Sequence, residues 1–76
     1  MMAGSAGYAV VGRSEDEPVL YHANKAREEA ERLCTQREAT VGRPCFVIGM
    51  AAWLADPRGA LRRAEAERFG GAPDTA

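Results

Sequence analysis

The chain is 76 residues long, which leaves room for one hydrophobic core. Its hydrophobic and charged residues, 46% and 28% of the chain, are those of a globular protein rather than a disordered one. With a net charge of −1 it lacks the basic excess that binds nucleic-acid phosphates, and no apolar run approaches the ~20 residues that span a bilayer. We therefore expect one cytoplasmic domain over residues 8–70, with a flexible leader (1–7) and a disordered tail (71–76).

The first two predicted elements are strands that form a hairpin. Residues 8–13 (YAVVGR) and 19–22 (VLYH) are rich in β-branched and aromatic side chains, and the polar segment 14–18 between them is typical of a hairpin loop. Pro18 has no N–H to donate to a neighbouring strand, so we place it at the loop end of the second strand.

An amphipathic helix is predicted next. Asn24 is a favoured N-cap residue, and apolar side chains follow it at spacings of three and four. The predicted buried stripe consists of Ala26, Ala30, Leu33, Cys34 and Val41. Charged residues occupy the other positions and keep the opposite face in water. Gly42 marks the predicted end of the helix, and Pro44 prevents it from resuming.

The run CFVIGM at residues 45–50 is apolar throughout, which is typical of a strand covered on both faces. A right-handed crossover places it beside the first strand and parallel to the second. The expected fold is therefore α+β. It is a three-stranded ββαβ sheet in the order 2-1-3, with one covering amphipathic helix and a C-terminal helix.

The C-terminal helix has clear boundaries. Asp56 as N-cap and Pro57 at the first helical position predict a helix that runs to about Phe69 and ends at Gly70. The preceding segment, 51–55, either extends the third strand or begins a turn.

The strands are apolar on both faces, whereas one helix covers only one face of a sheet. The C-terminal helix has a weak apolar stripe among four arginines, so two interpretations stay open. Either this helix folds back and completes the core of a monomer, or the second face binds a partner or a second copy of the chain. The apolar residues concerned are Trp53, Leu54, Leu61 and Phe69.

No set of residues predicts catalysis, a cofactor or a metal. His22 is the only histidine and has no nucleophile or carboxylate at a motif spacing, and no phosphate-binding glycine motif is present. Cys34 and Cys45 are expected to be buried free thiols, since a structural zinc site needs about four ligands. A disulfide between them stays open, because it requires Cα atoms within about 7 Å and an oxidising compartment.

The charged residues instead point to a protein partner. The acidic run in the hairpin loop would present a negative tip to a basic groove on another protein. Arginine and tryptophan are favoured at protein interfaces. The residues expected to bind the partner are Glu15, Asp16, Glu17, Trp53, Arg58, Arg62 and Arg63.

The segment from Tyr8 to Trp53 contains the hairpin, a helix that opens with KAREEAERL at residues 25–33, and the apolar strand. In this composition and order of elements it resembles a loose class of small phage and prophage open reading frames, among them anti-CRISPR proteins. The resemblance implies a non-enzymatic inhibitor that acts in the cytoplasm of a bacterial host and binds a CRISPR effector complex stoichiometrically. It transfers no site residue, because the class shares no site motif.

Two other classes of function stay open beside that expectation. One is a small nucleic-acid-binding or regulatory protein that uses the arginines of the C-terminal helix. The other is a self-associating structural protein, such as a homodimer, that uses the apolar face of the sheet.

Overall fold

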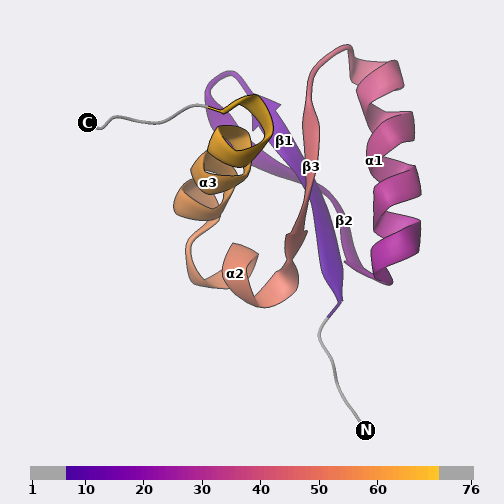
Figure 1. Ribbon diagram of the computed structural model, residues 1–76, viewed down its shortest axis with the longest axis horizontal. Coiled ribbons are helices and arrows are strands. Elements are labelled where there is room, and N and C mark those ends of the chain that lie inside the picture. The colour runs from indigo at the N-terminus through magenta and orange to yellow at the C-terminus, as the bar shows by residue number, and fades with distance from the viewer. Residues whose placement is uncertain (1–6, 71–76) are drawn as a thin grey trace, which may run out of the picture.

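A computed structural model describes residues 7–70 and places a sheet between two helical layers (Figure 1). The predicted leader, apart from Gly7, and the predicted tail (71–76) lie outside the described residues. Helix α1 packs on one face of the sheet, and α2 and α3 pack on the other. None of the helices in this described part is long and apolar enough to cross a membrane. The elements in chain order are β1 (Tyr8–Ser14), β2 (Glu17–Lys25), α1 (Arg27–Val41), β3 (Cys45–Gly49), α2 (Met50–Ala55) and α3 (Pro57–Phe69).

The sheet has the order β2-β1-β3, and both outer strands run antiparallel to β1. Val10 lies at its centre, opposite His22 on β2 and Val47 on β3. The two outer strands therefore run in the same direction. This confirms the α+β fold and the 2-1-3 order predicted from the sequence.

Strand β2 is longer than predicted and contains two irregularities. Val10 pairs with His22 but Val11 pairs with Leu20, which leaves Tyr21 as an extra residue, and a second shift separates Tyr8 from Val10. Such β-bulges bend a strand and re-aim its side chains. Residues on either side of the predicted 19–22 segment thus join the sheet, and Pro18 pairs with Arg13 inside the strand.

The start of α1 differs from the prediction. Asn24 is not its N-cap: it lies within β2 at a left-handed φ of 60°. Asparagine tolerates this conformation better than most residues, so it suits the irregular end of the strand. The residue that precedes the helix is Ala26, which offers no side-chain hydrogen bond to the first turn.

The other helix boundaries agree with the prediction. Gly42 ends α1 with a φ of 71°, and its N–H donates to the carbonyl of Glu38. The Asp56 carboxylate caps α3 by accepting a hydrogen bond from the N–H of Gly59 at 3.1 Å. Residues 51–55, left open between strand and turn, belong to the short helix α2.

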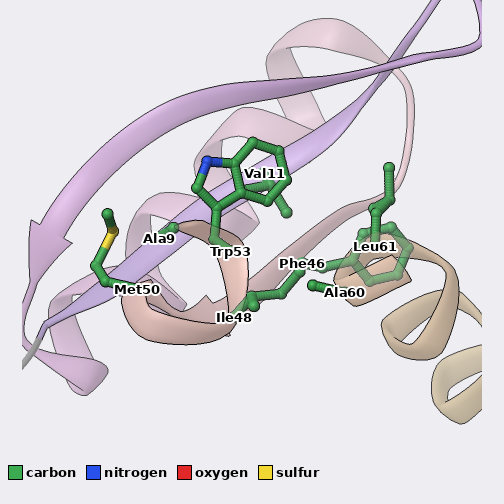
Figure 2. Packing of buried hydrophobic residues seen from close by; sticks show 8 residues of the cluster. All are labelled: Ala9, Val11, Phe46, Ile48, Met50, Trp53, Ala60 and Leu61. Atoms are coloured by element: carbon green, nitrogen blue, oxygen red, sulfur yellow. The ribbon is translucent and has the colours of Figure 1, made fainter. Parts of the chain in front are cut away.

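The larger core cluster lies between the sheet and the α2/α3 layer (Figure 2). It combines side chains from β1 and β3 with Trp53 of α2 and Leu61 of α3. Its buried members are Ala9, Val11, Phe46, Ile48, Met50, Trp53, Ala60 and Leu61. The C-terminal helix α3 therefore folds back and covers the second face of the sheet, as the first of the two interpretations expected.

The cluster beneath α1 is looser. Only Val10, Ala30 and Cys45 are fully buried there. Around them pack six partly buried side chains, namely Tyr8, Tyr21, Leu33, Cys34, Val41 and Val47. Of the stripe predicted for α1, Ala30 alone is buried and Ala26 is exposed.

Candidate protein-binding site

The tip of the β1–β2 hairpin presents two carboxylates to solvent. Glu15 and Asp16 form the loop and adopt positive φ angles of 52° and 72°. Positive φ at both central residues is the geometry of a type I′ turn, which matches the twist of the flanking strands. Both side chains are exposed.

Ion pairs attach this hairpin to α3. The Arg13 guanidinium donates two hydrogen bonds to the Glu65 carboxylate, at 3.0 and 2.9 Å, and this bonding raises the pKa of Arg13. Glu17 at the start of β2 pairs with Arg58 in the first turn of α3. The bidentate pair restricts orientation as well as distance, so the tip is held in place beside the helix.

A hollow of about 280 Å³ lies between the hairpin tip, the α1–β3 connection and the end of α3. We call it the tip groove. Its apolar lining comes from Pro44, Phe46 and Phe69, and its charged lining from Arg13, Glu15, Asp16, Arg43 and Glu65. An apolar surface with a charged rim can take an apolar side chain of a ligand while polar groups fix its orientation.

Packing contacts support the aromatic part of the groove. Phe69 is 59% exposed and packs edge-on against the buried Phe46, with ring centroids 6.1 Å apart and planes at 87°. The Arg68 guanidinium lies 5.5 Å from the Phe46 ring centre and 5.3 Å from that of Phe69. These cation–π contacts hold an exposed phenylalanine against the groove.

Arg68 also belongs to a second arrangement, at the outer edge of β3. The Glu38 carboxylate accepts a hydrogen bond from the N–H of Cys45 at 2.8 Å and pairs with Arg68, which donates to the Cys45 carbonyl at 2.9 Å. We call these three residues the edge clamp. The hydrogen bond from Arg68, followed by that from Cys45, lowers the pKa of Glu38.

The predicted partner-binding residues fall into four groups. Glu15 and Asp16 line the tip groove, and Glu17 and Arg58 form the ion pair beside it. Arg62 and Arg63 are exposed on α3 but do not line the groove. The remaining residue, Trp53, is only 7% exposed.

The placement of Trp53 on a binding surface is therefore corrected. Its indole packs in the α2/α3 core cluster, because α2 turns it towards the sheet. Other groove residues were not predicted as a site: Arg13, Arg43, Pro44 and Phe46 come together only through the tertiary fold. Phe69 was singled out in the sequence as a residue that either covers the sheet or mediates association, and it remains mostly exposed.

The two cysteines are free thiols in environments that favour protonation. Loss of hydration raises the pKa of Cys34 to about 11, and burial likewise raises that of Cys45. Since the thiolate is the reactive form, neither is prepared as a nucleophile at neutral pH. Within residues 7–70 no three His, Cys, Asp or Glu side chains gather in a way that could hold a metal ion.

Comparison with protein-family models, with curated proteins and with solved structures finds no match to this chain.

Proposed function

We propose that the protein is a non-catalytic protein-binding module and that the tip groove is its docking surface. The observation that carries the proposal is Phe69, a large aromatic side chain that stays 59% exposed beside an apolar hollow rimmed by charges. Protein interfaces concentrate their binding energy in such aromatic anchors, surrounded by polar groups that exclude water.

The charges of the groove indicate what the partner presents. Glu15 and Asp16 project from the tip and would meet basic side chains. Arg13 is already paired with Glu65, whereas Arg43 makes no ion pair within the described residues. The fitting partner is thus a protein with a basic surface next to a protruding apolar side chain.

The sharpest version of the proposal is inhibition of a CRISPR effector complex. Its support is the resemblance to anti-CRISPR proteins in size and in order of elements. The chemistry agrees, because an RNA-guided nuclease holds nucleic acid in a positively charged channel. An acidic tip is complementary to such a channel and would be steered towards it.

The charge distribution favours this function over nucleic-acid binding through α3. Arg58 and Arg68 are paired with Glu17 and Glu38, so the helix offers less free positive charge than its sequence suggests. Self-association through the sheet face is likewise less favoured, since α2 and α3 cover that face.

The proposal is tested by co-elution of the purified protein with purified CRISPR effector complexes, together with a DNA gel shift at physiological salt. We expect Phe69→Ser to abolish co-elution, whereas Leu54→Ser, which alters another exposed apolar residue, leaves it unchanged. Glu15→Lys with Asp16→Lys should weaken binding in a salt-dependent way. Because lysine tolerates the positive φ of Asp16 less well than aspartate does, thermal denaturation checks that the variant stays folded.

A matched charge control is available on α1. Glu28→Lys with Glu29→Lys makes the same change of charge at two exposed positions in the first turn of α1, whereas the groove lies beyond the other end of that helix. Equal weakening by both pairs would show that net charge and not the tip groove governs binding. Absence of co-elution with every effector rejects the CRISPR version, and a DNA shift without protein capture rejects the binding-module proposal itself.

A further inference from the structure

A second hollow, of about 170 Å³, lies between α1 and β2. It is lined by His22 from β2 and by Leu33, Gln36, Arg37 and Thr40 from α1. Its lining contains no carboxylate, although the chain has 11 acidic residues. This composition distinguishes it from the tip groove, whose lining contains both acidic and basic side chains.

The bulge in β2 explains why a histidine faces this hollow. His22 lies opposite Val10, whose side chain is buried on the α1 side of the sheet, so the imidazole points to the same side. Tyr21, the extra residue of the bulge, also packs in the α1 cluster. Two consecutive residues of β2 are therefore turned towards α1, which a regular strand does not allow.

Arg37 is held in place by an aromatic ring and makes no ion pair with a carboxylate among residues 7–70. Its guanidinium carbon lies 5.1 Å from the centre of the Tyr21 ring, a cation–π contact. By contrast, Arg13, Arg27, Arg58 and Arg68 all make ion pairs with Asp or Glu. The positive charge of Arg37 is thus positioned by an aromatic ring and its N–H groups are left for another acceptor.

We propose that this hollow binds a small oxyanion, a phosphate or carboxylate group. Arg37 supplies charged donors, the Gln36 amide supplies two N–H groups, and the His22 imidazole supplies one when neutral and two when protonated. The Thr40 hydroxyl already donates to the backbone carbonyl of Gln36 and forms part of the wall of the hollow. A water molecule takes up about 30 Å³ of liquid, so a group of five heavy atoms fits the volume.

The site is independent of the tip groove. Its residues come from the second half of α1 and from β2, and none of them lines the groove. Loss of oxyanion binding would therefore leave the proposed protein-binding function unaffected, and the two proposals fail separately.

The test is a titration followed by proton NMR at constant pH. Because His22 is the only histidine, its imidazole C–H resonances report on the hollow without ambiguity. We expect a saturable shift on addition of inorganic phosphate and none with sodium chloride at equal ionic strength. Sulfate and acetate arms show whether the site prefers a tetrahedral oxyanion or accepts carboxylates as well.

Variants of α1 provide the controls. Arg37→Gln should weaken phosphate binding about tenfold or more, the effect of losing one charge-assisted hydrogen bond. Arg32→Gln makes the same change at an exposed position outside the lining and should leave the titration unchanged. Gln36→Leu, which keeps every charge, should also weaken binding. Equal titrations for Arg37→Gln and Arg32→Gln, or a shift reproduced by chloride, would overturn the proposal.

Discussion

The two faces of the sheet are covered to different extents. On the α2/α3 face eight residues are buried in one cluster, whereas the α1 face buries three and leaves six others partly exposed. The longer helix α1, which the sequence predicted as the main amphipathic cover of the sheet, thus makes the looser layer. The better cover is the helix whose sequence shows only a weak apolar stripe.

The difference shows that the number of apolar residues a helix presents in sequence does not determine how closely the helix packs on the sheet. Helix α3 places the small residues Ala60 and Ala64 against the sheet, next to Leu61, and α2 adds Trp53. Small side chains let a helix approach closely, and the indole fills the remaining space. The hollow beside His22 lies under the looser helix, which fits a binding role for that face.

The largest expected effect on stability comes from truncating Leu61, and truncating Leu33 on the other face provides the comparison. Leu61→Ala removes a fully buried side chain and should lower the free energy of unfolding by about 2–5 kcal/mol. Leu33→Ala removes a partly buried one and should lower it by about 1 kcal/mol, since less apolar surface returns to water. Urea denaturation measures both. Equal losses would show that the two layers stabilise the fold to the same extent.

The next effect concerns the edge clamp, which joins α1 to α3 around β3. Glu38→Ala leaves the N–H of the buried Cys45 without its acceptor and should lower the free energy of unfolding by about 1–3 kcal/mol. Glu38→Gln keeps an acceptor and should cause a smaller loss. Thermal denaturation at pH 7 distinguishes the two variants.

The clamp also makes stability depend on pH. A carboxyl group with a lowered folded-state pKa stabilises the fold above its ordinary pKa, here 4.5, and this contribution is lost as the pH falls through the folded-state value. The difference in free energy of unfolding between the wild type and Glu38→Ala should therefore be largest at pH 7 and decrease in acid below about pH 4.5. A difference that is constant down to pH 2 would contradict the assignment.

The caps of the two helices give a smaller contrast. Ala26 precedes α1 in an extended conformation and makes no capping hydrogen bond, whereas Asp56 caps α3. Ala26→Ser should therefore stabilise the protein by about 1 kcal/mol, and Asp56→Ala should destabilise it by a similar amount. Guanidinium denaturation measures both changes. No gain from serine would indicate that the first turn of α1 is already satisfied by water.

The smallest expected effects are the couplings of surface ion pairs. A double-mutant cycle on Arg13 and Glu65, a bidentate pair between β1 and α3, should give a coupling energy of up to about 1 kcal/mol. The same cycle on Arg27 and Glu31, an exposed pair within α1, should give about 0.3–0.5 kcal/mol. Equal values would mean that attachment of the hairpin to α3 adds nothing beyond a surface pair.

Much of the fold followed from local signals in the sequence. Gly42, Asp56 and Pro57 act through their own backbone geometry, so the helix boundaries that they predict are confirmed. The position of β3 followed from its apolar run and from the handedness of crossovers. These features depend on a few neighbouring residues or on a general rule of topology.

Features that depend on strand pairing or on packing were missed. The bulges of β2 exist only relative to β1, so no segment of β2 alone reveals that Tyr21 and His22 both face α1. The same limit applies to Asn24, whose favourable capping chemistry is overridden by its place in the sheet. Trp53 is equally suited to a core or an interface by composition, and only the packing of α2 assigns it to the core.

The edge clamp has one more consequence, which concerns aggregation. Strand β3 lies at the edge of the sheet, and its sequence CFVIG contains no charge or proline to discourage pairing with a strand of another molecule. At Cys45 the clamp occupies the outward-facing N–H and C=O groups that would begin such pairing. Two side chains from opposite helical layers thus protect an edge whose own sequence has no protecting residue, and we expect loss of Glu38 or Arg68 to lower solubility as well as stability.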